Sequence, residues 1–242
     1  MTVFRPIKIR AKRLYQSLTS PFLIKKYLHN TSKKNRKLIL GGHWTKNEDW
    51  LILDQSHQDI TKKLKFPSSS INTIFLEHVF EHIDLDKAIY FLKEAKRILQ
   101  KGGHLRIISP SIERIIRTDL NKSNRNNKTY INNILINLHF KRTDALLKSI
   151  GLNGVKEDVN TFFLNSIFRE NEHKFICSAR LLKKILLALG FKKVEIFPPG
   201  QGFIKEHCLE RNQRGIYLGI DFKKDRKKKI FDIESLAVDA IK

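Results

Sequence analysis

The sequence predicts an α/β protein with a doubly wound, mostly parallel sheet of seven strands, a helical insertion and a basic N-terminal arm. Short apolar runs recur between residues 37 and 108, and each ends in a glycine or a polar residue. A segment with one apolar helical face separates two of these runs, in the order of a strand–helix–strand crossover. With 41% hydrophobic residues among 242, the chain can bury one sizeable core.

The expected strands are short and continuously apolar. Runs of this kind are typical of parallel strands that are covered on both faces. They are KLIL (37–40), WLIL (50–53), TIFL (73–76), LRII (105–108), KKVEIF (192–197) and GIYLGI (215–220). We expect the last two runs to complete the sheet.

Two amphipathic helices are expected between the strands. Asp84 or Asp86 can cap the first helix, and Gly102-Gly103 is expected to end it. Ser178 can cap the second helix, and Gly190 is expected to end it. Each helix carries one apolar face, which predicts that it packs on the sheet.

Residues 1–36 are interpreted as a basic arm that precedes the main domain, residues 37–242. No acidic residue occurs before Glu48, and the whole chain carries a formal net charge of +23. Such a charge attracts polyanions, although a lysine-rich composition also arises without a polyanionic partner. Pro6 and Pro21 are expected to interrupt a long helix. We expect the arm to bind an anionic surface and to contribute nothing to the core.

The rest of the chain shows few special segments. Residues from 111 to about 176 lack strand signals and predict a helical cap inserted over the site. No stretch approaches the roughly 20 apolar residues of a membrane span, and the N-terminus lacks the apolar run of a secretory signal. Cys177 and Cys208 form no metal-type spacing. These features favour a location in the reducing cytosol.

Glycines and carboxylates follow three successive strands. Gly41 and Gly42 follow the first strand, Asp54 follows the second and Glu77 the third, while Asp59 lies in a loop nearby. In an open parallel sheet, ligands bind at the carboxyl ends of the strands. The pattern therefore indicates a nucleoside-type ligand, with ordinary turn glycines and helix-capping acids as the alternative.

Longer motifs carry a resemblance to a known family. They are LILGGHW (38–44), WLILD (50–54), DITKKLKFPSSSINTI (59–74), LEHVFEHI (76–83), FLKEAKRILQKGGHLRIISP (91–110) and HKFICSARLLKKILLALGFKKVEI (173–196). In this order they resemble the class I S-adenosylmethionine-dependent methyltransferase family, which has a Rossmann-like fold. The closest resemblance is to a compact branch often found among cell-surface polysaccharide genes. The motifs cover about half of the chain.

The resemblance implies S-adenosyl-L-methionine as cofactor. It places Gly41 and Gly42 under the methionine part, Asp54 on the ribose and Asp59 by the adenine, with Glu77 at the mouth of the site. Two positions depart from the family pattern. His43 stands where a further glycine is usual, and Asn72 stands where Asp is usual. These departures raise the alternative of a weakened or lost cofactor site.

The stretch from His78 to His82 matches the H-x-x-E-H pattern of some zinc proteases. That chemistry needs a helix that presents both histidines, whereas here the stretch follows a strand directly. The resemblance places it beside the methyl group that is transferred. His82 and Glu81 are the candidates for a general base, with a packing role for His82 as the alternative. No residue is assigned as a metal ligand, and a metal near Glu77, Glu81 and His82 is left open.

These observations predict an S-adenosylmethionine-dependent methyltransferase that acts on a small-molecule or glycan acceptor, in cell-surface polysaccharide biosynthesis. The basic arm would contact anionic membrane from the cytoplasmic side. An RNA methyltransferase is one alternative, although no N-P-P-Y-type tetrapeptide or known RNA-binding module occurs, so nucleic acid is the less favoured partner. A catalytically degenerate S-adenosylmethionine-binding protein is the other. The sequence does not indicate an oligomeric state.

Overall fold

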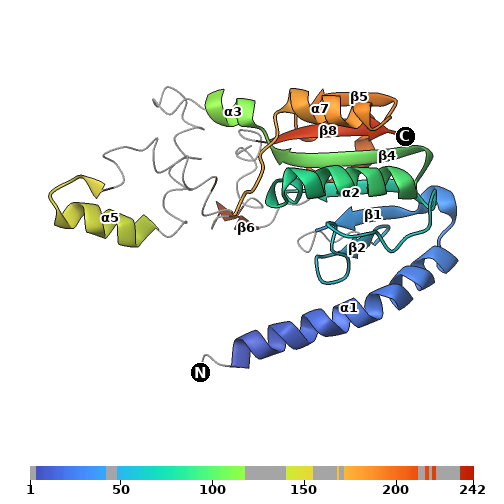
Figure 1. Cartoon of the computed structure of the whole chain (residues 1–242), viewed down its shortest axis with the longest axis horizontal. Helices are drawn as coiled ribbons and strands as arrows, with labels where there is room; N and C mark the ends of the chain where they lie inside the picture. Colours follow the sequence, from blue (N-terminus) through green and yellow to red (C-terminus); the bar gives the residue numbers. More distant parts are fainter. Residues whose placement is uncertain are drawn as a thin grey trace.

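A six-stranded mixed sheet forms the centre of the protein, as Figure 1 shows for a computed structural model of the chain. The structure describes residues 4–41, 48–117, 140–154, 168, 172–211, 216–217, 220–221 and 235–242. Its sheet strands are β1 (Lys37–Leu40), β2 (Leu51–Leu53), β3 (Ile71–Glu77), β4 (Leu99–Pro110), β5 (Lys193–Phe197) and β8 (Ser235–Ile241), in the order β2-β1-β3-β4-β8-β5.

The sheet confirms the predicted α/β class and its mostly parallel arrangement. β1 pairs in parallel with β2 and β3, and β3 pairs in parallel with β4, whereas β8 is antiparallel to both β4 and β5. Among the described residues the sheet has six strands rather than the seven expected. The first four predicted strands lie at the expected places, and each extends its apolar run by a few residues at most, except β4.

The last strand of the sheet differs from the prediction. GIYLGI supplies β6 (Ile216–Tyr217) and β7 (Ile220–Asp221), which form a separate antiparallel pair. The sheet is completed by β8 instead, which is hydrogen-bonded on both sides and buried along almost its whole length. The sequence of β8, SLAVDAI, is interrupted by a charged residue, Asp239, and so does not look like a core strand.

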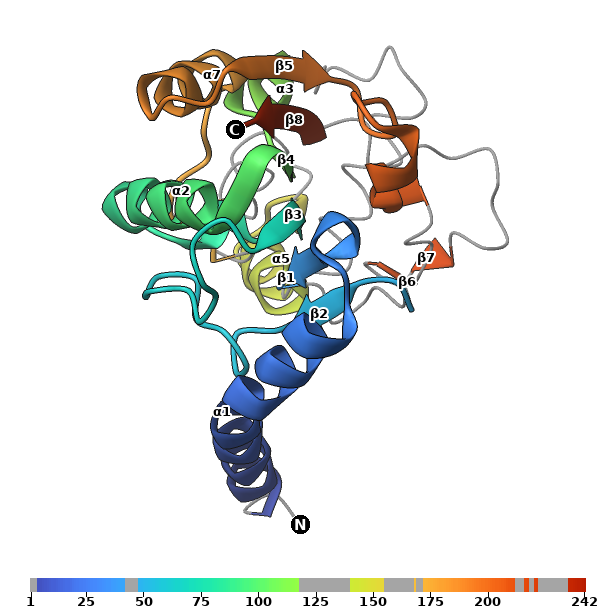
Figure 2. The same ribbon diagram turned by 90° about the vertical axis from the view of Figure 1, so that its right-hand side faces the viewer.

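Two helices cover one face of the sheet. α2 (Leu85–Ile98) and α7 (Ala179–Ala188) pack there, and Figure 2 shows them on the opposite side from the segment that carries the short 3-10 helices η5 (Lys205–His207) and η6 (Leu209–Arg211). The Oγ atom of Ser178 accepts a hydrogen bond from the backbone N–H of Leu181 at 3.0 Å, so this predicted cap is confirmed. Gly190, with φ of 82°, follows α7 as expected.

The predicted end of α2 is wrong. Asp84 occupies the N-cap position, but its side chain makes no capping hydrogen bond. The helix ends at Ile98 because Leu99 is already extended, with φ of −64° and ψ of 143°, and starts β4. Gly102 and Gly103 therefore lie inside β4, where a Cβ on Gly103 would press against the backbone of Gln100 and Asn72.

The basic arm is a continuous helix, α1 (Phe4–Asn30), that runs through Pro21. The expectation that Pro21 interrupts a long helix is therefore wrong. Proline cannot donate to the carbonyl four residues earlier, which is that of Ser17. The hydroxyl of Ser20 donates to that carbonyl at 3.1 Å and replaces the missing partner.

The second half of the arm belongs to the core, contrary to the prediction that residues 1–36 contribute nothing to it. Ile24 is only 3% exposed and lies in the main core cluster, with Tyr27 and Leu28 packed against that cluster. The hydroxyl of Tyr27 accepts a hydrogen bond from the backbone N–H of Lys37 at 2.7 Å. The guanidinium of Arg36 donates to the carbonyl groups of Leu28, at 2.5 Å, and of Ser70.

Two described segments of the expected insertion are helical. They are α3 (Ile112–Arg117) and α5 (Phe140–Ser149). Most of the remaining insertion, residues 118–139, 155–167 and 169–171, lies outside the described residues. The two other short 3-10 helices are η1 (Lys33–Asn35) and η2 (Phe80–His82). None of the described helices is long and apolar enough to span a membrane.

The buried end of α1 leads to a stability prediction. Ile24→Ala should lower the free energy of unfolding by about 2–5 kcal/mol, because it removes buried methyl and methylene groups from the main core. Leu18→Ala is the matched control on the same helix, since Leu18 is 71% exposed, and should change the free energy of unfolding by about 0.5 kcal/mol or less. Urea denaturation of the two full-length variants gives both values. Equal effects would show that α1 is independent of the core.

Candidate functional site

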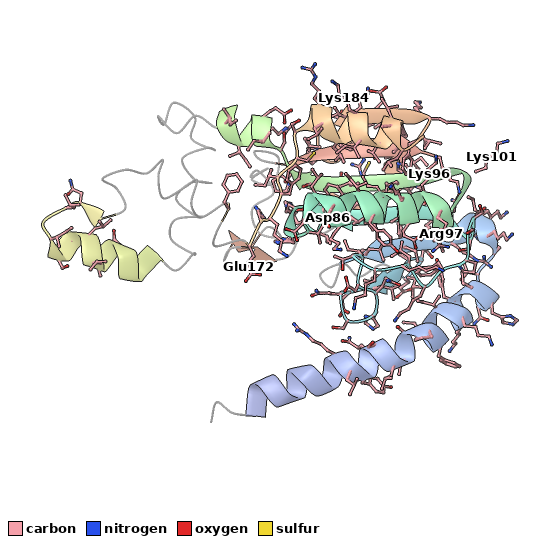
Figure 3. The ribbon with its side chains drawn as sticks, in the orientation of Figure 1. Asp86, Lys96, Arg97, Lys101, Glu172 and Lys184 are labelled. Atoms are coloured by element: carbon pink, nitrogen blue, oxygen red, sulfur yellow. The ribbon has the colours of Figure 1, made fainter. Side chains whose placement is uncertain are left out.

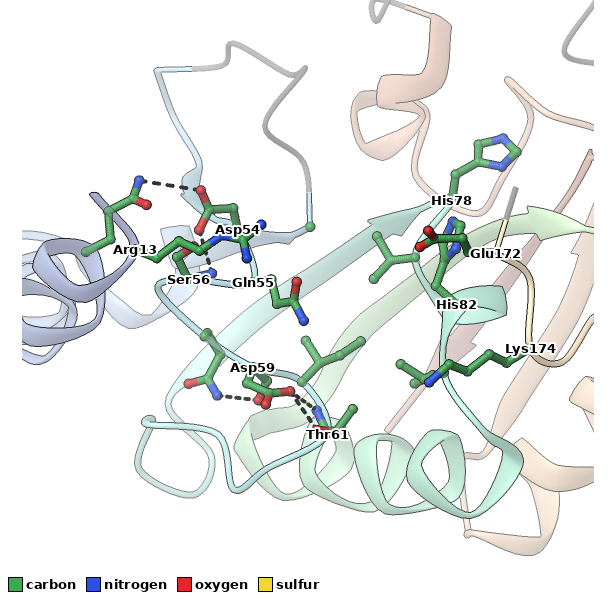
Figure 4. A pocket seen from close by; sticks show the side chains of 16 residues that line it. Arg13, Asp54, Gln55, Ser56, Asp59, Thr61, His78, His82, Glu172 and Lys174 are labelled. Carbon is green, nitrogen blue, oxygen red and sulfur yellow. Dashed lines mark hydrogen bonds between the residues drawn. The ribbon is translucent and has the colours of Figure 1, made fainter. Parts of the chain in front are cut away.

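A cavity of about 720 Å³ lies at the carboxyl ends of β1, β2 and β3. The chain moves from β1 outward to β2 and then back across to β3, so the strand order reverses between β1 and β3. Such switch points are the ligand-binding crevices of open α/β sheets. Figure 4 shows the two facing walls, which come from the loop of residues 54–61 and from the loop of residues 78–83.

Gly41 lies at the end of β1 and lines the cavity. Its φ of 81° is in the left-handed region, and a Cβ at this position would overlap with the side chain of Val79. The glycine is thus required by the close approach of the β1 and β3 loops as well as by its backbone conformation. Gly42 and His43 lie outside the described residues, so their predicted roles stay predictions.

Asp54 also lines the cavity, directly after β2. Its Oδ1 atom accepts hydrogen bonds from the backbone N–H groups of Ser56, at 2.8 Å, and His57, and contacts the His57 ring at 2.8 Å. Burial alone would raise the pKa of Asp54, but His57 and these backbone donors outweigh it and hold the pKa below its usual value. The carboxylate is therefore ionised and fixed in place at neutral pH.

Asp59 lines the same wall, as predicted. Its Oδ1 atom accepts hydrogen bonds from the backbone N–H and the hydroxyl of Thr61, at 2.9 and 2.7 Å. These bonds form a local turn around the carboxylate rather than the helix cap that the sequence left open for the acidic residues. Asn72, the second departure from the family pattern, lies near the amino end of β3. At about 3.3 Å per residue it is roughly 16 Å from the carboxyl end of that strand.

Glu77 does not line the cavity. Burial raises the pKa of its carboxyl group to about 7, against an opposing effect of His78, and its Oε2 atom has no hydrogen-bond partner among the described residues. The side chain lies on the sheet face that also carries Arg106, because Phe75 and Arg106 pair in register between β3 and β4. The structure therefore separates Glu77 from the other predicted cofactor residues.

Glu81 is completely buried behind the cavity wall. Its Oε1 atom lies 3.0 Å from Nδ1 of His78, and its Oε2 atom accepts a hydrogen bond from the hydroxyl of Ser109 at 3.3 Å. Nε2 of His78 in turn lies 3.2 Å from the hydroxyl oxygen of Ser235. Burial alone would raise the pKa of Glu81, but His78 outweighs it and lowers that pKa. The histidine bonded to Glu81 is thus His78, while His82, the other candidate for the general base, lines the cavity.

His82 lines the cavity and packs edge-to-face on His173, with ring centroids 4.9 Å apart. In the sequence His173 looked structural, and nothing in the local pattern connects it with His82. Burial lowers the pKa of His173 to about 4, so its ring is neutral at neutral pH. Because η2 is a single 3-10 turn and His78 has a φ of 50°, no helix presents both histidines of the zinc-protease pattern.

The sequence also gave no sign that α1 reaches the cavity. Arg13 and Gln16 of this helix line it, and Nε2 of Gln16 donates a long hydrogen bond, 3.5 Å, to Oδ2 of Asp54. Glu172 and Lys174, from the segment before α7, lie on the opposite side beside His82 (Figure 4). The cavity is therefore lined by segments that lie far apart in the sequence.

Residues 27–107 match the family model described as a methyltransferase domain. No curated protein matches the chain. Among solved structures, the chain is similar to an S-adenosylmethionine-dependent methyltransferase from Archaeoglobus fulgidus, at 16% identity over 94% of each chain and a TM-score of 0.44. It is also similar to a possible histamine N-methyltransferase from Thermotoga maritima, at 11% identity over 98% of this chain and 97% of that one, with a TM-score of 0.40.

The family match covers β1, β2, β3, α2 and most of β4, which are the elements that build both walls of the cavity. The match over residues 27–107 supports the prediction of a methyltransferase.

Proposed function

We propose that the cavity binds S-adenosyl-L-methionine along the wall of residues 54–61 and transfers its methyl group to a small-molecule or glycan acceptor beside His82. The observation that carries the proposal is the meeting of Gly41, Asp54 and His82 in one cavity at the switch point of the sheet. The cavity volume of about 720 Å³ lies within the usual range for small-molecule and cofactor sites.

The Asp54 wall fits the nucleoside part of the cofactor. Oδ1 of Asp54 is held by the turn that follows it, while Oδ2 accepts only the 3.5 Å bond from Gln16 among the described residues. Oδ2 can therefore accept a hydrogen bond from a ribose hydroxyl. Ile60 adds an apolar surface beside Asp59 for the adenine ring. Gly41 leaves room for the methionine part.

The cofactor supplies a methyl group that is already activated on a sulfonium. What the protein adds is mainly in-line positioning of the acceptor and exclusion of water. α1 contributes to the exclusion of water, since Arg13 and Gln16 line one side of the cavity. His82 contributes to the positioning of the acceptor, because its ring lies on the wall opposite Asp54 (Figure 4). An acceptor hydroxyl next to His82 would be placed between the two walls.

We also propose that α1 contacts anionic membrane on the cytoplasmic side, where lipid-linked glycans of the cell surface are made. Leu14, Leu18 and Phe22 are 63%, 71% and 73% exposed, and their spacing of four residues places them on one face of the helix. Lys25 and Lys26 are exposed on the same helix. A helix that combines exposed apolar residues with cationic ones is typical of peripheral membrane binding.

Two other functions remain distinguishable by experiment. An RNA methyltransferase would use the net charge of +23 for phosphates but has no need of the exposed apolar residues on α1. RNA retained on purification would favour it. A degenerate relative would bind no cofactor, and calorimetry tests this directly. The position of Asn72, far from the cavity, removes one of the two reasons to suspect degeneracy.

The cofactor site predicts the effect of one substitution. Asp54→Ala should weaken the binding of S-adenosylhomocysteine by about ten- to a hundred-fold, because it removes a charge-assisted hydrogen bond worth roughly 1.5–3 kcal/mol. Asp86→Ala, an exposed position at the start of α2 (Figure 3), is the control and should bind as wild type does. Isothermal titration calorimetry measures all three proteins. Unchanged affinity in a folded Asp54→Ala variant would contradict this placement of the cofactor.

The membrane contact leads to a separate prediction. Leu18→Glu should reduce binding to vesicles that contain phosphatidylglycerol, because a charge replaces an apolar side chain that would enter the membrane interface. Leu146→Glu, on α5, is the matched control, since Leu146 is 64% exposed, and should bind vesicles as wild type does. Vesicle co-sedimentation at low and high salt measures both variants. Equal binding by Leu18→Glu and wild type would rule out this face of α1 as the contact.

A further inference from the structure

Three side chains with metal-ligating atoms meet at the wall of the cavity. One ligand atom from each of Glu81, His82 and His173 lies within 4.8 Å of the other two. Ligand atoms that share one tetrahedral ion at about 2.1 Å lie about 3.4 Å apart, so small side-chain rotations are enough to bring the three onto a common ion. His82 lines the cavity, while Glu81 is buried behind it.

The ring of His173 lacks the hydrogen bonds that a buried histidine needs. Its side chain is only 6% exposed, and its Nδ1 atom has no hydrogen-bond partner among the described residues. Its Nε2 atom lies 4.0 Å from Oε1 of Glu81, which is too far for a hydrogen bond. A buried polar atom without a partner costs free energy, and an ion bound at Nδ1 would remove that cost.

Backbone hydrogen bonds hold the two segments of the cluster together. The carbonyl oxygen of Glu81 accepts hydrogen bonds from the backbone N–H groups of Lys174, at 2.8 Å, and Phe175, at 3.2 Å. His173 is therefore held next to Glu81. In the sequence, His173 lies 91 positions after His82. These backbone hydrogen bonds therefore help to set the distance between the ligand atoms of Glu81 and His173.

A second layer of hydrogen bonds orients the carboxylate. His78 and Ser109 contact its two oxygen atoms at 3.0 and 3.3 Å, and Ser235 contacts the far nitrogen of the His78 ring at 3.2 Å. Carboxylates that ligate metals are commonly held by such outer partners. The backbone N–H of Glu81 is a third donor to this carboxylate, so one lone pair remains for an ion.

We propose that Glu81, His82 and His173 bind a divalent transition-metal ion whose open positions face the cavity. Two imidazoles and one carboxylate suit Zn²⁺, Mn²⁺ or Co²⁺, whereas Mg²⁺ and Ca²⁺ prefer ligand sets made only of oxygen. Three protein ligands leave at least one position for an outside group, as in catalytic metal sites. The position on the cavity side of His82 is the open one.

With this ion bound, the acceptor group in the proposed methyl transfer can be a hydroxyl. Only this step of the inference rests on the proposed function. A cation lowers the pKa of an oxygen acid that it binds. The acceptor hydroxyl would release its proton to water, the bond between the sulfonium sulfur and the methyl carbon would break, and a bond between that carbon and the acceptor oxygen would form. The cofactor leaves as the neutral thioether. His82 would then act as a ligand rather than as the base.

Metal uptake by the full-length protein tests the site. After removal of metals with a chelator, wild type should bind one Co²⁺, detected by its visible absorption, and Zn²⁺ should displace it. His82→Ala and His173→Ala should each weaken Co²⁺ binding by more than about 100-fold, since even outer-layer changes cost about 10- to 100-fold. His29→Ala removes an exposed histidine of α1 and is the matched control, with binding equal to wild type.

The outcomes separate this proposal from the proposed function. Lack of stoichiometric Co²⁺ uptake by wild type, or equal losses in His29→Ala and His173→Ala, overturns the metal site. If either His82→Ala or His173→Ala is unstable, the melting temperature of the other variant is compared with that of wild type. A rise with Zn²⁺ in wild type that is absent from this variant still supports the metal site. Titration with S-adenosylhomocysteine is the independent readout: metal uptake without cofactor binding contradicts only the proposed function, and cofactor binding without metal uptake contradicts only the metal site.

Discussion

A buried arginine determines how the second half of the chain closes over the first. Arg106, in the middle of β4, is fully buried, and its guanidinium donates to Oδ1 of Asp239 at 2.6 Å and to the carboxylate of Glu210. Burial alone would lower the pKa of Arg106, but the two carboxylates outweigh it and raise that pKa. A cation removed from water in this way must be paired, because a single buried charge costs several kcal/mol. β8 and the turn η6 supply the two partners.

This ion cluster also explains where sequence reasoning succeeded and where it could not. The strands β1 to β4 were predictable because each is an apolar run that ends in turn residues, which is a local property. β8 was not predictable, because Asp239 looks polar until Arg106 stands opposite it in the antiparallel register. The role of α1 was missed for a similar reason. Ile24 and Ser20 become informative only when the core and the carbonyl of Ser17 are known.

The candidate site likewise contains some residues whose place was predictable from the local sequence and others whose place was not. Gly41, Asp54, Asp59 and His82 follow strands whose positions in the sequence were predicted, and the structure brings all four to one cavity. Glu77 lies apart from them because a shift of one residue along a strand changes the face on which a side chain lies, and the apolar run does not mark that face. The local spacing does not show which histidine contacts Glu81, whereas the left-handed backbone at His78 directs its ring towards β8.

Glu81 connects the fold to the chemistry. A buried carboxylate with a lowered pKa is a fixed negative charge, and its environment contains three histidines rather than an arginine or a lysine. One of them, His78, is held by hydrogen bonds on both nitrogens, so it serves to orient the carboxylate. His82 and His173 are left to face the remaining lone pair. Nε2 of His173 lies 4.0 Å from Oε1 of Glu81, which is too long for a hydrogen bond but a suitable spacing for two ligands of one ion, and this spacing is the main support for the proposed site.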